Sequence, residues 1–387
     1  MIGFIVMVAR KGEGRISELL SEARLAAAID AVEKAKKVGC FDPIIVATNW
    51  PEAAKAFREM GAVVDLDQGD FHFGGRLLAL VSKYKLGKVF YTGAASIPLL
   101  PPSFLAQIAS FLEGDGVLVA NNLFSSDWVG FSPAEALGKI VPPSSDNDLA
   151  WRLWDEAGLR PIIPPHSTAT TFDIDTPSDL LILKAYPGLE GKLASFVEKL
   201  PLGAEVVWKI AKVLKDEDAF ILAAGRVPSY AWEKLEREAL CRTRVISEER
   251  GMRSSGRLAR GEVRSLLGYL VEALGPEGFF RRAAEMAKAA IIDTRVLMAH
   301  RGIWPPDEER FASDLMVPEE ISDPWLRDFT RAAKEAPIPV LLGGHSLVCG
   351  GIMALVDIAR HQGLKGRRTE SFPWDVGSLS NPSGEDL

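Results

Sequence analysis

A repeating order of apolar strand, polar loop and helix constrains the fold of this chain more than any other feature. Residues 2–9 form an uninterrupted apolar run, and residues 17–38 follow with a helical pattern after a short polar loop. An uninterrupted apolar run predicts a strand that is buried on both faces, as in a parallel sheet with helices on each side. Further strands are predicted at 43–48, 62–66, 88–92 and 116–120, and further helices at 51–60 and 149–157. We therefore predict an α/β fold whose first part is a doubly wound, mostly parallel sheet.

The length of 387 residues favours two domains over one. Pro- and Gly-containing breaks near residue 202 predict a first domain at 1–202. A second domain at 203–365, mainly helical and of α/β or α+β class, would follow. Residues 366–387 end in Ser-Asn-Pro-Ser-Gly-Glu-Asp-Leu, which is typical of a flexible tail.

The overall composition excludes several classes of function. A formal net charge of −7 argues against a nucleic-acid-binding protein, because binding to a phosphate backbone needs a basic surface. The three cysteines are far apart and predict neither a disulfide framework nor a zinc site. The apolar N-terminus lacks the basic start of a signal peptide, and no apolar run reaches membrane-spanning length. We expect a cytoplasmic protein that binds neither nucleic acid nor membranes, and the composition leaves open whether it forms an oligomer.

An acidic segment at residues 172–183 is the strongest candidate for a functional site. Apolar residues at 172 and 174 alternate with Asp173 and Asp175, which predicts a short strand carrying both carboxylates on one side. Two carboxylates suit Mg²⁺, which binds through one or two carboxylates plus substrate phosphates. The spacing favours equally a second interpretation, in which the two aspartates only solvate the end of a strand.

The same segment predicts that a helix begins directly after the strand. Thr176 stands at an N-cap position and Pro177 at a first helical position. Asp179, three residues after the threonine, completes a variant of the capping box.

Residues 173–180 match the pattern Asp-[Ile/Val]-Asp-Thr-Pro-x-Asp-Leu. With this motif the first half of the chain resembles a nucleotidyltransferase family that includes molybdenum-cofactor guanylyltransferase, 2-phospho-L-lactate guanylyltransferase and the sugar- and polyol-phosphate cytidylyltransferases. The resemblance implies the fold of the nucleotide-diphospho-sugar transferases (GT-A-like). It also implies transfer of a nucleoside monophosphate from an NTP, with GTP or CTP favoured, to a phosphorylated or anionic small molecule. Mg²⁺ would be the cofactor, held by Asp173 and Asp175, with Asp173 also catalytic.

A polar loop between the first predicted strand and the first predicted helix is a candidate phosphate site. Backbone amides at a helix N-terminus, flanked by cations, attract anions, and in the resembling family this loop receives the NTP phosphates. The resemblance assigns catalytic roles to Lys11 and Arg15. It assigns nucleotide binding to Arg10, Gly12, Gly14 and Arg24. A solvated basic turn is the alternative interpretation.

The chain departs from the family pattern after the strand predicted at 88–92. The family reads Gly-Asp-x-Pro-Leu-Leu there, and its aspartate is a principal Mg²⁺ ligand. This chain has Ala94, Ala95 and Ser96 instead of an acid. Either Asp173 and Asp175 hold the metal with help from residues elsewhere in the chain, or catalysis has been lost. The second case predicts a protein that binds a nucleotide or nucleotide sugar without turnover.

Polar residues after the strand predicted at 116–120 are candidates for substrate binding. In open α/β sheets, ligands bind at the carboxyl ends of the strands. The predicted substrate-binding residues are Ser96, Asn121, Asn122, Ser126, Asp127 and Asp148. A turn that is rich in Asn, Ser and Asp for backbone reasons is the competing interpretation.

The second half matches no family pattern. A strand at 219–224 precedes Gly225 and Arg226, and arginines recur among Gly and Ser at 248–260, where phosphate clamping and a surface loop are both open interpretations. A helical pattern covers 262–300, and a long loop is predicted at 301–318. Residues 339–351 resemble the nucleophile elbow of α/β-hydrolases, which makes a serine hydrolase at Ser346 a remote alternative, although a valine replaces the second glycine.

Overall fold

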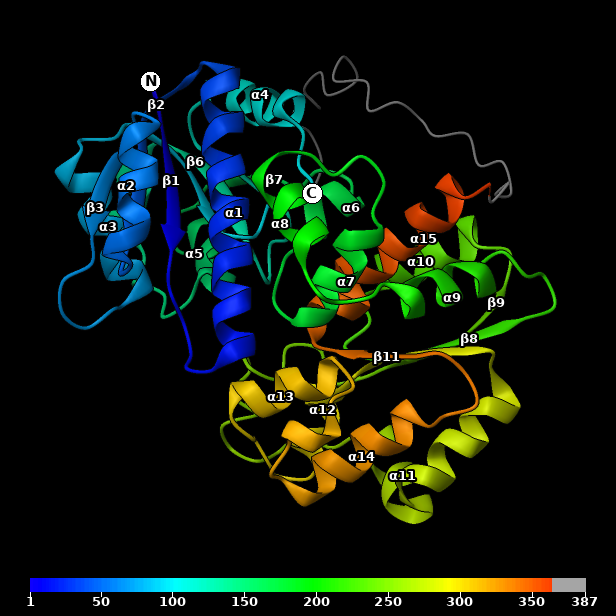
Figure 1. Cartoon of the computed structure of the whole chain (residues 1–387). Coiled ribbons are helices and arrows are strands. Elements are labelled where there is room, and N and C mark those ends of the chain that lie inside the picture. The colour runs from blue at the N-terminus through cyan, green and yellow to red at the C-terminus, as the bar shows by residue number, and fades with distance from the viewer. Residues whose placement is uncertain (364–387) are drawn as a thin grey trace, which may run out of the picture.

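The first strand, β1 (Ile2–Val8), lies inside a seven-stranded sheet of the computed structural model, which describes residues 1–363. Phe4 and Val6 pack into one apolar core, whereas Ile5 packs into a second core on the opposite face. Helices cover both faces of the sheet (Figure 1). The uninterrupted apolar run thus reflects a strand that is buried on both sides.

The first sheet has the strand order β3-β2-β1-β4-β6-β5-β7. Only β6 runs antiparallel to its neighbours. The strands after β1 are β2 (Phe41–Thr48), β3 (Val63–Leu66), β4 (Lys88–Gly93), β5 (Val117–Ala120), β6 (Trp128–Ser132) and β7 (Arg160–Ile162). The helices are α1 (Arg15–Val38), α2 (Pro51–Glu59), α3 (Phe73–Lys83), α4 (Pro102–Phe111), α5 (Leu149–Asp155), α6 (Thr168–Thr171), α7 (Pro177–Ala185) and α8 (Gly191–Lys199), with 3-10 turns η1 (Ala134–Lys139) and η2 (Asp146–Asp148). The predicted doubly wound, mostly parallel sheet is confirmed.

A second, four-stranded sheet follows, and all of its strands are parallel in the order β11-β10-β8-β9. The strands are β8 (Phe220–Gly225), β9 (Arg242–Ser247), β10 (Ala289–Asp293) and β11 (Val340–Gly343). The remaining elements are α9 (Glu205–Val213), α10 (Ser229–Glu238), α11 (Leu266–Met286), α12 (Thr294–His300), α13 (Asp307–Asp314), η3 (Pro318–Glu320), α14 (Pro324–Lys334), the π-helical turn η4 (Leu347–Gly351) and α15 (Ile352–His361). A helix-rich α/β second half is thus confirmed. The domain boundary at residue 202 stays a prediction, and the predicted tail at 366–387 lies outside the described residues.

Three predicted elements are corrected by the structure. The helical pattern at 262–300 contains β10, because a short apolar run cannot be assigned to strand or helix by periodicity alone. The predicted loop at 301–318 contains α13. Residues 172–175 are an extended segment and not a strand, since their backbone makes no ladder with another strand of the described residues: Ile174 N donates to the Ala95 oxygen at 3.2 Å, and Phe172 N donates to Thr168 in the preceding helix.

The helix predicted after Thr176 begins where the capping pattern places it. α7 starts at Pro177, and the Thr176 and Asp179 side chains form a reciprocal capping box. The side chains before it alternate as predicted, because Phe172 and Ile174 are buried while Asp175 is exposed.

Helices of the first half share one apolar core with the second sheet. Residues of α1, α7, α8 and α9 belong to the same buried cluster as residues of β8, β10, β11 and α15 (Figure 1). At residues 1–363 no helix is long and apolar enough to span a bilayer.

We predict that Gly350→Ala destabilises this junction by about 2–4 kcal/mol. A Cβ at Gly350 would lie 2.5 Å from the Phe172 Cα and 2.6 Å from the Thr171 oxygen, and backbone atoms cannot move aside as a side chain can. Urea denaturation measures the effect. Gly138→Ala is the matched control, because its Cβ would meet no atom within 4 Å; equal destabilisation by both changes would contradict the prediction.

Candidate functional site

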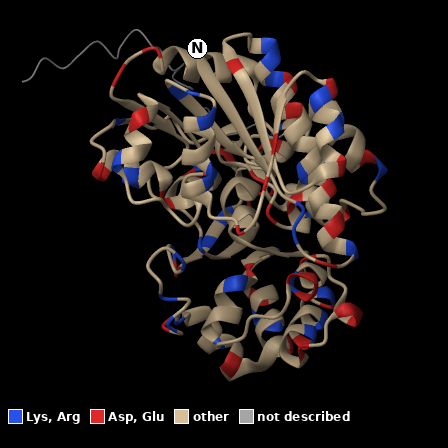
Figure 2. Ribbon diagram, turned by 90° about the vertical axis from the view of Figure 1, so that its left-hand side faces the viewer, with Lys and Arg blue, Asp and Glu red and all other residues tan. Residues whose placement is uncertain are grey.

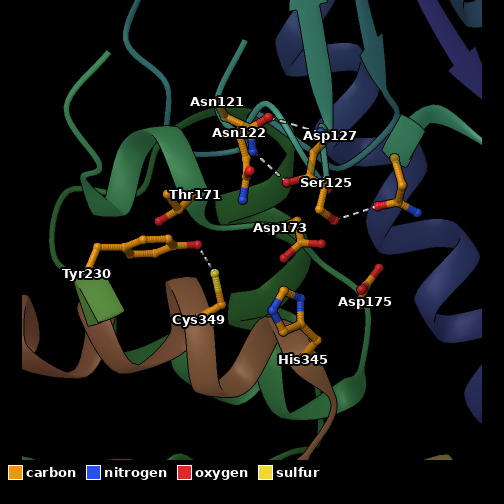
Figure 3. A pocket seen from close by; sticks show the side chains of 11 residues that line it. Asn121, Asn122, Ser125, Asp127, Thr171, Asp173, Asp175, Tyr230, His345 and Cys349 are labelled. Carbon is orange, nitrogen blue, oxygen red and sulfur yellow. Dashed lines mark hydrogen bonds between the residues drawn. The ribbon is translucent and has the colours of Figure 1, made fainter. Parts of the chain in front are cut away.

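A cavity of about 70 Å³ lies between the carboxyl edge of the first sheet and the second half of the chain. Its walls come from both halves, as Figure 3 shows. The lining residues are Asn121, Asn122, Ser125, Asp127, Asn147, Thr171, Asp173, Asp175, Tyr230, His345 and Cys349. Among the predicted site residues, Asn121, Asn122, Asp127, Asp173 and Asp175 are therefore brought together.

Three aspartates, Asp127, Asp173 and Asp175, line this cavity, and a fourth, Asp146, lies close enough for its charge to act on Asp127. Asp127 follows β5 and is oriented by Asn121, whose Nδ2 donates to the Asp127 carboxylate at 2.6 Å. Asp146 begins η2 and accepts a hydrogen bond from the Tyr91 hydroxyl at 3.1 Å. Acidic positions gather at the centre of the molecule, where the strands of the first sheet end (Figure 2).

The carboxylates of this cluster raise one another's pKa. Burial, followed by the charge of Asp146, raises the pKa of Asp127 to about 7. Burial and the charges of Asp175 and Asp127 raise the pKa of Asp173 well above its ordinary value. Within residues 1–363, none of the four forms an ion pair. The cavity therefore concentrates negative charge that only a proton or a bound cation would neutralise.

Asp179 holds the backbone of the acidic segment in place through hydrogen bonds. Its Oδ2 accepts from the backbone N–H groups of Asp175 (3.0 Å) and Thr176 (2.7 Å), and from the Ser346 hydroxyl at 2.7 Å. Its other oxygen is buried without a hydrogen-bond partner among the described residues, and burial raises the pKa of Asp179 to about 7.

The second half supplies three lining residues that sequence reasoning did not assign to this site. Tyr230 lies in the first turn of α10, and its hydroxyl lies 2.8 Å from the Cys349 Sγ in η4. His345 follows β11, and burial, followed by the charge of Arg226, lowers its pKa to about 4. Burial raises the pKa of Cys349 to about 12. The imidazole is thus neutral and the thiol protonated at neutral pH.

Ser346, the residue singled out by the elbow-like pattern, points away from the cavity. The side chain is 2% exposed, and its hydroxyl donates to Asp179. Its role in the structure is to join the loop after β11 to the cap of α7.

The helix N-terminus that we predicted to bind phosphates is occupied by a carboxylate of the second half. Glu308 accepts from Ile16 N at 2.7 Å, from Ser17 N at 3.0 Å and from the Ser17 hydroxyl at 2.9 Å. Gly14 makes this approach feasible, because a Cβ there would lie 2.5 Å from the Glu308 carboxyl carbon. Gly12 lies beside it with φ 77°.

The predicted cations differ in their surroundings. Arg15 pairs with Glu320 at 2.8 Å, and Arg10 pairs with Glu18. Arg24 donates to the backbone oxygens of residues 174 and 175, at 2.9 Å each, and so positions the acidic segment. Burial raises the pKa of Asp146, and the charge of Lys11, an exposed residue, opposes that rise. Lys11 is therefore the predicted cation whose charge acts on the acidic cluster.

The remaining predicted substrate residues surround the cavity without lining it. Ser126 is buried and donates to the Asp146 backbone oxygen at 2.7 Å, and Asp148 ends η2. Ser96 lies against Gly93, at whose Cβ position the Asp146 carboxylate would be 4.0 Å away. Asp146 thus brings a carboxylate to the strand end where the family pattern has its aspartate. The roles of all these residues stay predictions.

The donor set of the cavity fits Mg²⁺ in its chemistry. In the described part of the chain no group of three or more His, Cys, Asp or Glu side chains is arranged as a ready metal site. Mg²⁺ requires fewer protein ligands, since it binds through one or two carboxylates and keeps water and phosphate oxygens. Asp173 and Asp175, which carry no ion pair, meet this requirement.

Comparisons with known proteins bear on the fold alone. No family model matches the chain, and no curated protein matches it. A CMP-2-keto-3-deoxy-manno-octonic acid synthetase complexed with CTP aligns at 14% identity and TM-score 0.37, over 48% of this chain and 97% of its own. A cytidylyltransferase from Leptospira borgpetersenii aligns at 14% identity and TM-score 0.38, over 51% of this chain and 92% of its own. A protein from Desulfovibrio desulfuricans, described as a nucleotide-diphospho-sugar transferase, aligns at 15% identity and TM-score 0.39, over 51% of this chain and 94% of its own.

We predict that Asp127→Asn stabilises the ligand-free protein at pH 8 by about 1–2 kcal/mol and has a smaller effect at pH 4.5. The folded-state pKa of Asp127 is raised to about 7. In the unfolded chain the same carboxyl has its ordinary pKa of about 4. Between about pH 4 and pH 7 the folded state therefore holds a proton that the unfolded state has lost, and the free energy of unfolding falls as the pH rises through this range. Thermal denaturation at the two pH values measures it. The exposed Asp218→Asn is the control, and a benefit of Asp127→Asn that does not grow with pH would contradict the prediction.

We further predict that Glu308→Ala lowers the free energy of unfolding by about 1–2 kcal/mol, because two amides at the start of α1 lose their acceptor. Glu319→Ala is the control, since its carboxylate lies 3.8 Å from Lys334 and is exposed. Equal stability of the two variants in urea denaturation would show that the Glu308 contact contributes little.

Proposed function

We propose that this protein is a Mg²⁺-dependent nucleotidyltransferase that transfers a nucleoside monophosphate from an NTP to a phosphorylated or anionic small molecule. The gathering of Asp127, Asp173 and Asp175 in one cavity with Asp146 beside them, without an ion pair from the described residues, carries the proposal. The Asp-Ile-Asp-Thr-Pro-Ser-Asp-Leu motif supports it, because this motif supplies two of the four carboxylates and the cap that orients them.

The proposed reaction forms a bond from an acceptor oxygen to the α-phosphorus of the NTP and breaks the bond to the β-phosphate, so that pyrophosphate leaves. Bound Mg²⁺ would neutralise phosphate charge, and Asp173 and Asp175 would hold it. Lys11, whose charge already acts on Asp146, would attract the phosphates to the same edge. Asn121 keeps the Asp127 carboxylate in place, and Arg24 holds the backbone of the acidic segment.

The position of Glu308 limits where the NTP phosphates would bind. The amides of Ile16 and Ser17 already bind its carboxylate, and Arg15 is paired with Glu320. NTP phosphates would therefore bind at the Lys11 side of the loop, or they would displace Glu308 from the helix N-terminus.

A binding protein without turnover is the second candidate. The alanines at 94 and 95, where the family pattern has its aspartate, favour it. The approach of Asp146 to Gly93 supports the enzyme instead, because a carboxylate reaches that strand end from another segment. A requirement for Mg²⁺ separates the two candidates.

We predict that one NTP among GTP, CTP, UTP and ATP raises the melting temperature only when Mg²⁺ is present. A ligand at 100 times its Kd stabilises the folded state by about 2.7 kcal/mol. Asp173→Asn and Asp175→Asn should abolish the shift, and the exposed Asp218→Asn should retain it. A shift that is indifferent to Mg²⁺ would favour the binding protein, and the absence of a shift with every NTP would exclude the enzyme and leave only a protein that binds a nucleotide sugar.

A further inference from the structure

A group of arginines lies at the carboxyl edge of the second sheet. The strand order places β8 between β9 and β10, so the connections leave β8 in opposite directions. The crevice at such a switch point is where open α/β sheets bind ligands. Arg226 directly follows β8, and Asp293 is the last residue of β10.

Two of these arginines are neutralised inside the fold. Arg226 binds Asp293 with two hydrogen bonds, at 2.6 and 3.1 Å. Arg295 binds Asp314 with two further hydrogen bonds, one of them 2.6 Å long. These buried pairs lie at the carboxyl edge of the second sheet and supply little free charge.

Two further arginines, Arg253 and Arg310, lie over the ring of Trp304. Their guanidinium carbons are 5.5 and 4.7 Å from the ring centroid. Arg253 has no ion pair within residues 1–363, whereas Arg310 pairs with Asp307. The Arg310 Nε is buried without a hydrogen-bond partner among the described residues. A donor left unpaired in this way costs free energy unless a ligand satisfies it.

The charges of neighbouring arginines act on both Arg253 and Arg310. Partial desolvation and the charge of Arg226 lower the pKa of Arg253. Desolvation and the charges of Arg295 and Arg253 lower the pKa of Arg310 to about 10. Both side chains remain protonated at neutral pH while repelling each other, and a bound anion would relieve that repulsion.

The arginines lie close enough to the acidic cavity for charges to act between the two groups. The charge of Asp175 acts on Arg253, and the charges of both Asp175 and Arg226 act on His345, which lines the cavity. The carboxyl edges of the two sheets thus face each other, with carboxylates on one side and guanidinium groups on the other.

We propose that Arg253 and Arg310, held over Trp304, bind an oxyanion of the acceptor, a phosphate ester or a carboxylate, so that the second half selects the acceptor. This proposal rests on the proposed function for the identity of the ligand as acceptor. Guanidinium groups suit the site because they bind planar or tetrahedral oxyanions with paired hydrogen bonds. The carboxylates at Asp173 and Asp175 would repel the same anion, which separates it from the metal side.

The test measures binding of inorganic phosphate, and of acetate at matched ionic strength, to the full chain without nucleotide or Mg²⁺. We expect phosphate, acetate or both to raise the melting temperature, which identifies the preferred oxyanion. Arg253→Gln and Arg310→Gln should each weaken binding of that anion roughly tenfold. Arg260→Gln, in the same segment but paired with Glu262 at 2.8 Å, should bind like the unsubstituted chain.

Unchanged anion binding in Arg253→Gln, or no shift with either anion in the unsubstituted chain, would overturn this proposal. Because Arg253 is exposed, its substitution should leave the fold intact, which urea denaturation of the variant checks. The Mg²⁺-dependent NTP shift should persist in Arg253→Gln, whereas Asp173→Asn should lose that shift and keep anion binding. The two proposals can therefore fail independently.

Discussion

The structure depends on one buried carboxylate, that of Asp179. A single oxygen of this side chain accepts hydrogen bonds from the backbone of Asp175 and Thr176 and from the hydroxyl of Ser346. The first two bonds start α7 and direct the acidic segment toward the cavity. The third connects that segment to the loop after β11. Removing this acceptor would leave buried donors unpaired on both sides of the junction, which makes the residue both a helix cap and a joint between the halves.

Because Asp179 connects segments of both halves, residues of both halves line the cavity. Each half presents the carboxyl edge of a sheet, mostly parallel in the first half and parallel in the second, where strand ends and helix starts expose polar groups. The first edge carries Asp127, Asp173 and Asp175, and the second carries His345 and the arginines beside it. A ligand with both a metal-bound phosphate and a separate anionic group would match this division of charge. The rate of turnover would then depend on the residues at each edge and also on the contacts that hold the two halves together.

The contact between Glu308 and α1 shows the same dependence on both halves. In the sequence, a glycine-containing basic loop before a long helix predicts a phosphate site by the physics of helix N-termini. In the structure, the helix N-terminus does bind an anion. That anion is a carboxylate of the protein itself, Glu308, which lies 292 residues from Ile16 in the sequence. No local pattern identifies such a partner, because the helix N-terminus attracts any anion and only the packing of α13 against α1 decides which one arrives.

The sequence by itself determined the elements that depend only on residues near one another in the chain. The apolar run of β1 indicated burial on both faces, and the spacing of Thr176, Pro177 and Asp179 indicated where α7 begins, because capping acts within one helical turn. Tertiary structure alone decided which strand ends meet. It placed Asp146 beside Gly93, Tyr230 and Cys349 across from Asp173, and Arg253 with Arg310 over Trp304. These juxtapositions depend on crossovers and on docking of the two sheets, which result from burial of apolar surface that specifies no partner in the sequence.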